Sequence, residues 1–176
     1  MPENPVLIIG GGPAGLEAAR GVADLGYPVT LVEKEDRLGG TPIHCDYAAL
    51  TPNMVNAEEA MGAMVKKIEN DPLIDIRTST EITTASGNAP ELQVTLKGQS
   101  GEEQLNAGRV IVATGFKHFD PGKETQMYGY YEFDDVITLV DTERMLKAGK
   151  FVRPSTGEPP KQVCFIQCVG LSLIHI

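Results

Sequence analysis

Short runs of apolar residues alternate with a longer small-residue segment in the first part of the chain. Residues 6–9 are four consecutive apolar residues, three of them β-branched, which is the pattern of a parallel strand buried on both faces. Small and apolar positions after Pro13 predict a helix that lies close to a sheet, and Gly26 is typical of the residue that follows a helix. Residues 29–32 predict a second strand that ends at Glu33.

The pattern continues through the middle of the chain. Apolar residues at helical spacing predict an amphipathic helix over residues 56–70, with Asn56 as its N-cap. Residues 73–78 predict a third parallel strand. Between residues 91 and 115, alternating apolar and polar positions predict a β-meander that is followed by a buried return strand.

After Gly115 the pattern becomes less regular. Residues 142–148 predict a short helix that is capped by Asp141 and ended by Gly149. The stretch 153–161 is rich in Pro, Gly and polar residues and predicts a linker. Residues 163–169 then predict another buried strand.

Composition narrows the function classes. The net charge of −9 argues against nonspecific binding to nucleic acid or to anionic membranes. No apolar run approaches the roughly 20 residues that span a bilayer, and no signal peptide is visible, so we expect a cytoplasmic protein without membrane insertion. Three cysteines do not make a disulfide scaffold, and three histidines lack the spacing of a zinc site.

A G-x-G-x-x-G motif lies between the first predicted strand and helix, at Gly10, Gly12 and Gly15. The first glycine permits a tight turn, the second lets the backbone approach a pyrophosphate, and the third lets helix and strand pack closely. The helix N-terminus offers free N–H groups to phosphates. Glu33, eighteen residues after Gly15, can accept hydrogen bonds from both ribose hydroxyls of an adenosine.

A glycine-rich turn of another α/β fold is the alternative, but the flanking strand, helix and acid favour a dinucleotide site. The expected fold class is therefore α/β, a Rossmann-like FAD/NAD(P)-binding fold with a parallel sheet, helices and an inserted β-meander. FAD and NAD both present an adenosine diphosphate to this motif. The meander before an Ala-Thr-Gly sequence is not part of a plain NAD-binding domain, which favours FAD.

At these residues the chain resembles the flavoproteins with two dinucleotide-binding domains, the superfamily of the pyridine nucleotide-disulfide oxidoreductases. The resemblance implies that the first glycine-rich unit binds FAD and that the Gly-Gly pair at 39–40 lies along the dinucleotide. It also implies that the Ala-Thr-Gly stretch at 113–115 returns to the flavin side, and that the backbone contact to adenine comes from Ile82. The candidate FAD-binding residues are Gly10, Gly12, Pro13, Ala14, Gly15, Glu33, Lys34, Gly39, Gly40, Ile82, Ala113, Thr114 and Gly115.

One feature of the disulfide reductases in this superfamily is missing. They carry a redox C-x4-C pair soon after the Gly-Gly pair, whereas Cys45 stands alone there. A flavin–dithiol relay cannot operate from a single thiol at this position. We expect Cys45 to be a packed or loop thiol, and no catalytic acid or base is assigned.

A narrower resemblance rests on the stretch 128–170, which contains "YGYYEF" and "VRPSTGEPPKQVCFIQCVG". It is similar to the A subunit of heterodisulfide reductase. The resemblance implies a flavin that passes electrons between a donor and iron–sulfur clusters, with other redox subunits as partners. It identifies Cys168 as the first of four ligands of a 4Fe–4S cluster that only a full-length protein could hold. Cys164 matches no ligand, and we expect it to be a buried strand residue.

The resulting division of the chain has four parts: an FAD-binding domain at 1–119, a connector and linker at 120–160, the first strand of a truncated second nucleotide-binding-like domain at 161–170, and a non-native tail at 171–176. On this interpretation the chain is a fragment of an oxidoreductase and is inactive alone. The alternatives are an NAD(P)H-dependent flavoenzyme of the glutamate synthase small subunit type and the A subunit of a quinone-interacting oxidoreductase. A flavin-binding structural subunit without turnover is a further alternative.

Overall fold

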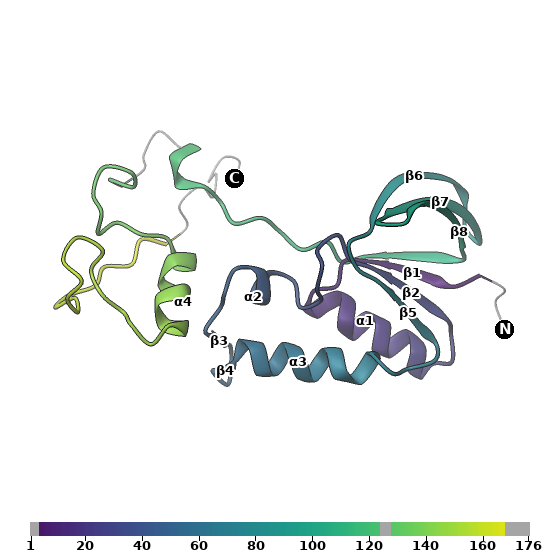
Figure 1. Cartoon of the computed structure of the whole chain (residues 1–176), viewed down its shortest axis with the longest axis horizontal. Helices are drawn as coiled ribbons and strands as arrows, with labels where there is room; N and C mark the ends of the chain where they lie inside the picture. Colours follow the sequence, from purple (N-terminus) through teal and green to yellow (C-terminus); the bar gives the residue numbers. More distant parts are fainter. Residues whose placement is uncertain (1–3, 124–127, 168–176) are drawn as a thin grey trace, which may run out of the picture.

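The computed structural model describes residues 4–123 and 128–167 and is built around a parallel sheet. Its four strands are β1 (Val6–Ile9), β2 (Val29–Val32), β5 (Ile74–Arg77) and β9 (Arg109–Val112), in the order β5-β2-β1-β9. All three strand pairs are parallel, as predicted for residues 6–9 and 73–78. The return strand that was expected to be buried is β9, and its Val112 is 70% exposed. Figure 1 shows the sheet beside two long helices.

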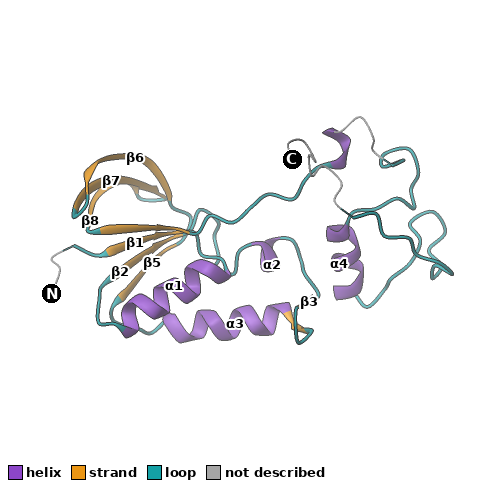
Figure 2. Ribbon diagram, turned by 180° about the vertical axis from the view of Figure 1, so that it is seen from behind, coloured by secondary structure: helices purple, strands orange, loops and turns teal. Residues whose placement is uncertain are grey.

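Helices α1 (Pro13–Asp24) and α3 (Ala57–Ile68) cover one face of this sheet (Figure 2). Asn56 caps α3 as predicted, because its side-chain oxygen accepts the backbone N–H groups of Glu58 and Glu59. Between β2 and α3 lie the short elements α2 (Thr41–His44), β3 (Ala49–Leu50) and β4 (Val55–Asn56). The core of this layer consists of Ile8, Leu16, Ala19, Val29, Leu31 and Ile68.

The other face of the sheet packs against an antiparallel three-stranded sheet, β6-β7-β8. Its strands are β6 (Glu81–Asn88), β7 (Glu91–Gly98) and β8 (Gly101–Ala107). The meander over residues 91–107 is confirmed, but β6 was not predicted. The sequence of β6 is polar and mostly exposed, so it lacks the apolar alternation by which strands are recognised.

Beyond β9 the chain forms a second region with less regular structure. The described part of this region contains a 3₁₀ turn, η1 (Pro121–Lys123), and the helix α4 (Leu139–Lys147). The prediction that Asp141 caps this helix is wrong. Thr138 is the N-cap, and its hydroxyl accepts the Asp141 N–H (3.2 Å) while the Asp141 carboxylate accepts the Thr138 N–H (3.1 Å), so the helix begins three residues earlier.

The stretch predicted as a linker is folded into a closed turn. The Arg153 N–H donates to the Glu158 carbonyl at 2.8 Å. Asp135 accepts hydrogen bonds from the Arg153 guanidinium (2.6 and 2.9 Å) and from the Ser155 amide and hydroxyl (3.0 and 2.8 Å). These donors, the Ser155 amide first, lower the pKa of the Asp135 carboxyl.

The strand expected at 163–169 does not form over residues 163–167, and its last two residues lie outside the described part. Cys164 is exposed there, so the expectation that it is buried in a strand is wrong. A strand needs a neighbour for its N–H and C=O groups, and no described strand pairs with this segment. Within 4–123 and 128–167, no helix is long and apolar enough to cross a membrane.

Candidate dinucleotide-binding site

Three strand ends meet at one edge of the parallel sheet. Strands β1, β2 and β9 are followed by Gly10, Glu33 and Ala113, respectively. The sheet continues through them, because the Gly10 N–H donates to the Val32 carbonyl and the Ala113 N–H donates to the Ile9 carbonyl, both at 2.8 Å. The chain runs outward from β1 through β2 to β5 and then crosses to β9. The edge beside β1 is therefore the topological switch point where open α/β sheets bind ligands.

Helix α1 begins at this edge with its positive end. Gly12 is its N-cap and provides no side-chain cap, and the first turn carries no acidic residue. Its first N–H groups thus lack intrahelical acceptors and are available to an anion. Gly15 brings the helix close to the sheet, since a Cβ at this position would lie 1.8 Å from the Gly10 carbonyl oxygen.

The turn at Gly39 and Gly40 packs directly on the glycine-rich loop. The Gly39 N–H donates to the Gly11 carbonyl at 2.8 Å. Gly40 has a φ of +59°, and a Cβ there would lie 2.6 Å from the Cα of Gly12. A Cβ at Gly12 would still have 3.6 Å to the Cα of Gly40. Gly12 and Gly40 therefore place no side chain in the space at the start of α1, as close approach of a diphosphate requires.

Glu33 is held at the edge of this space and is only 6% exposed. One carboxylate oxygen accepts the Gly11 N–H at 2.6 Å, and the other accepts the Glu35 N–H at 2.9 Å. Each carboxylate oxygen has a further acceptor position. The backbone amides thus fix the carboxylate, which retains the capacity to accept ribose hydroxyls.

Gly11 is a residue that the motif analysis missed, because it occupies a variable position of G-x-G-x-x-G. A Cβ there would lie 2.4 Å from Leu38 Cδ2 and 3.1 Å from Glu33 Oε2. The signal was the additional, middle glycine in "GGGPAG". Its amide positions Glu33, so Gly11 belongs to the site.

The remaining candidates occupy different surroundings. The side chain of Lys34 is exposed and pairs with Glu35 at 3.4 Å. Ile82 lies in β6 opposite Leu96 and packs against the core beneath the meander. The Thr80 N–H donates to the Glu33 carbonyl at 2.9 Å, which brings the start of β6 to the same edge of the sheet. Cys168 lies outside the described residues.

The described part of the chain offers no group of metal ligands. Cys45 is half-buried and unpaired, in agreement with the expected packed or loop thiol. Nearby, His44 Nε2 is buried without a hydrogen-bond partner among the described residues.

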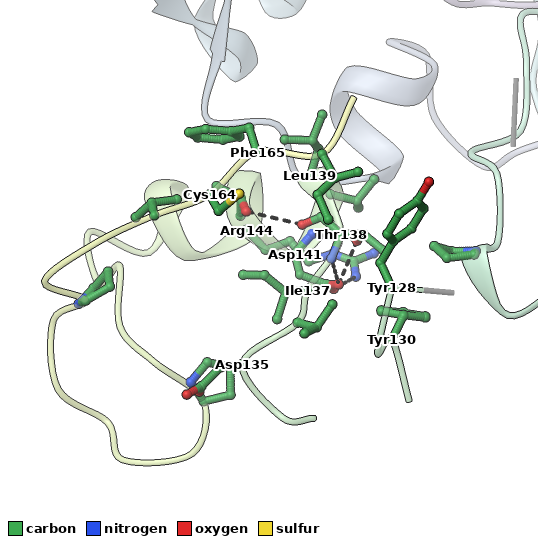
Figure 3. Close-up of a pocket in the computed structure, with 18 of the residues that line it drawn as sticks. Tyr128, Tyr130, Asp135, Ile137, Thr138, Leu139, Asp141, Arg144, Cys164 and Phe165 are labelled. Carbon is green, nitrogen blue, oxygen red and sulfur yellow. Dashed lines mark hydrogen bonds and ion pairs between the residues drawn. The ribbon is translucent and has the colours of Figure 1, made fainter. Parts of the chain in front are cut away.

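A large cavity of about 1180 Å³ lies in the second region, away from the glycine-rich turn. Figure 3 shows its walls, to which Tyr128, Tyr130, the start of α4 and the segment around Cys164 contribute. Cys45 and His118 also line it. The cavity shares no lining residue with the glycine-rich turns, so the dinucleotide site and the cavity are separate features.

The chain is similar to known proteins in its family and in its narrower relatives. A family model described as pyridine nucleotide-disulphide oxidoreductase matches residues 4–151. The chain is 29% identical to the A subunit of the ferredoxin/F(420)H(2)-dependent CoB-CoM heterodisulfide reductase of Methanosarcina acetivorans, over 94% of the chain and 31% of that protein. It is 28% identical to the first iron-sulfur A subunit of the CoB-CoM heterodisulfide reductase of Methanopyrus kandleri, over 96% of the chain and 37% of that protein. The chain thus spans about a third of the length of these relatives.

Solved structures agree on the fold. The L-proline dehydrogenase from P. horikoshii matches with a TM-score of 0.57 and 25% identity, over 64% of the chain and 22% of the dehydrogenase. Thioredoxin reductase of Lactococcus lactis matches with a TM-score of 0.56 and 20% identity, over 67% of the chain and 37% of the reductase. The expected Rossmann-like α/β class is thereby confirmed.

Proposed function

Because the chain belongs to the pyridine nucleotide-disulphide oxidoreductase family, we propose that the carboxyl edge of its parallel sheet binds FAD. The observation that carries this proposal is the close approach of Gly12 and Gly40, which have no side chains, beside the N-terminus of α1 that no side chain caps. A buried acid, Glu33, follows β2 eighteen residues after Gly15, which is about where this motif has the acid that binds an adenosine ribose.

Each part of the cofactor would meet a matching group. The diphosphate would lie at the amides of Gly12, Ala14 and Gly15, where the helix dipole favours negative charge. The adenosine ribose would donate to the carboxylate of Glu33, and the meander side, at Ile82, would border the adenine. Residues 39–40 and 113–115 would border the dinucleotide toward the flavin. When bound, FAD supplies the redox chemistry, and the protein contributes binding and electrostatics.

The likeness to the A subunit of heterodisulfide reductase supports a more specific proposal. We infer that the chain is the flavin-binding part of a longer oxidoreductase that passes electrons to iron–sulfur clusters and works with other redox subunits. The two relatives are the A subunits of heterodisulfide reductases, and one of them is named an iron-sulfur protein. In a full-length protein Cys168 would be the first thiolate of a 4Fe–4S cluster. The four-part division of the chain and the cytoplasmic location also stay predictions.

Titration of the purified protein with FAD, FMN and NAD, followed by flavin fluorescence or calorimetry, tests the cofactor proposal. We expect FAD to bind and FMN, which lacks the adenosine diphosphate, to bind far more weakly. Gly12→Ala should abolish most FAD binding without harming the fold, because the added methyl fits against Gly40 but occupies the space of the diphosphate. Glu33→Ala should weaken binding by about 10- to 100-fold, the value of charge-assisted hydrogen bonds.

The matched control is Glu35→Ala, which removes a neighbouring carboxylate whose side chain is 47% exposed. It should leave the FAD affinity within about twofold of wild type. A folded wild-type protein that retains no FAD, or a Gly12→Ala variant that binds FAD normally, would overturn the proposal. Preference for NAD over FAD would instead identify a nicotinamide site.

A further inference from the structure

The segment after the Gly39–Gly40 turn connects the dinucleotide site to the second region. The N–H groups of Ile43 and His44 both donate to the Gly40 carbonyl at 3.0 Å, and the Cys45 N–H donates to the Thr41 carbonyl at 2.9 Å. Residues 40–45 thus form one hydrogen-bonded turn. Gly40, the first residue of this turn, faces Gly12, and Cys45, its last residue, begins the stretch 45–48.

Helix α4 of the second region contacts this stretch through two side chains. Lys147 Nζ lies 2.9 Å from Asp46 Oδ1 and 3.1 Å from Glu58 Oε2. The Ala48 N–H donates to the Glu143 carboxylate at 2.9 Å. Figures 1 and 2 both show α4 beside the segment between α2 and β3. One lysine therefore ties α4 to the stretch 45–48 and to the first turn of α3.

The connector reaches the same stretch from another direction. The Tyr47 hydroxyl and His118 Nε2 are 2.9 Å apart, and Phe116 packs edge-on against the His118 ring. Asp46 itself has a φ of +57°, a left-handed conformation that is uncommon outside glycine. The stretch thus has a sparsely populated backbone conformation that contacts from residues 118, 143 and 147 hold in place.

From these contacts we propose that Lys147 and Glu143 are positioning residues for the dinucleotide site. By holding residues 46–48, α4 holds the hydrogen-bonded turn 40–45 and keeps Gly40 against Gly12. This inference rests on the proposed FAD binding. Docking of α4 and binding of FAD then favour each other, and by thermodynamic reciprocity each must strengthen the other by the same factor.

The charges of this contact are stable over a broad pH range. A hydrogen bond from Lys147 lowers the pKa of Asp46, to which Arg144 and Arg37 also contribute, and the hydrogen bonds to Asp46 and Glu58 raise the pKa of Lys147. The Asp46 contribution is lost only as the pH falls below the ordinary pKa of 3.8, and the Lys147 contribution only as the pH rises above the ordinary pKa of 10.5. Salt, by contrast, screens exposed pairs. The contribution of the Lys147–Asp46 pair to the coupling should therefore depend on ionic strength and not on pH between about 5 and 9.

The experiment measures the FAD dissociation constant of the full chain at low and high salt. Lys147→Glu should weaken FAD binding by about three- to tenfold at low salt, in line with the modest strength of partly exposed ion pairs. The effect should shrink at high salt. Lys66→Glu is the matched control, because it makes the same charge change on α3, where no ion pair to Lys66 is seen among the described residues. Adding Asp46→Lys to Lys147→Glu restores one opposite-charge pair and should recover part of the affinity.

Hydrogen exchange provides a readout that does not depend on any variant. FAD should slow exchange of the Ala48 amide and of the α4 amides in the wild-type protein, although neither lies at the dinucleotide site. Equal FAD affinities for Lys147→Glu and Lys66→Glu, or FAD binding with no added protection at Ala48, would overturn the inference while leaving the FAD site intact. Failure of the wild type to bind FAD would instead overturn the proposed function first.

Discussion

The two regions of this chain are held together by different forces. Every buried apolar residue of the described structure lies between Leu7 and Ala107, within the sheets and helices of the dinucleotide-binding region. Helix α4 of the second region has no buried residue. Ten of the sixteen exposed large apolar side chains follow Gly115, in the described part of residues 116–167. The first region has a hydrophobic core, whereas the second is organised by hydrogen bonds and ion pairs.

This difference explains how the second region keeps a defined shape. The carboxylate of Asp135 accepts four hydrogen bonds that close the turn at 153–158, and a capping box starts α4. Lys147 and Glu143 then attach the helix to the first region. Such contacts fix geometry but contribute little stability when they are exposed. Local unfolding of the second region should therefore cost much less free energy than global unfolding.

The largest loss of stability is expected from a substitution at the closest backbone contact of the first region. Gly15→Val should destabilise the protein by about 4 kcal/mol or more, because no shift of a flexible side chain can relieve a Cβ placed 1.8 Å from the Gly10 carbonyl oxygen. Urea denaturation followed by circular dichroism measures this loss. Gly21→Ala in the same helix is the control, since a Cβ there meets nothing within 4 Å. It should stabilise by about 0.5–1 kcal/mol, and equal effects of both changes would contradict the close-packing argument.

A pair of leucine truncations compares the regions directly. Leu31→Ala should cost about 2–5 kcal/mol of unfolding free energy, because Leu31 is fully buried and its loss leaves a cavity. Leu139→Ala, at a side chain that is 68% exposed, should change it by less than about 0.5 kcal/mol. The same denaturation experiment measures both. A large loss of unfolding free energy in Leu139→Ala would show that this side chain is buried in a hydrophobic core in solution.

Apolar periodicity predicted the strands and helices correctly where the chain buries its own side chains. The strands at 6–9 and 29–32, the two long helices and the meander follow from it, and the structure has all of them. It failed at β6, whose residues are polar, and at residues 163–167, whose apolar residues are exposed and have no strand partner among the described residues. Apolar periodicity therefore predicts the structure of segments that pack against others, whereas α4, which buries no residue, was predicted from the residues at its ends.

Some positions of the candidate site were likewise predictable from the sequence, and others were not. The positions of Gly12, Gly15 and Glu33 follow from spacing alone, because a strand, a tight turn and a helix leave one arrangement for them. The role of Gly11 depends on where the Glu33 carboxylate and Leu38 come to lie, and the contact of α4 with residues 46–48 joins positions about a hundred apart in sequence. Tertiary contacts of this kind leave no local pattern in the sequence.

The smallest expected effect concerns the first turn of α4, where the sequence favoured Asp141 as the cap. Thr138→Ala removes the hydroxyl that accepts the Asp141 N–H and should cost about 1 kcal/mol of local helix stability. That loss corresponds to roughly five- to tenfold faster hydrogen exchange of the α4 amides, because 1.4 kcal/mol is a factor of about ten. Asp141→Ala removes the bonds that its carboxylate accepts from the Thr138 N–H and hydroxyl, and the 3.5 Å ion pair with Arg144. It leaves the hydroxyl that caps the Asp141 N–H in place, so its effect on the helix should be smaller. Because α4 buries no side chain of its own, the global unfolding midpoint should not move with either change. A larger effect from Asp141→Ala would restore Asp141 as the dominant cap, and a shift of the global midpoint would show that the two regions unfold together.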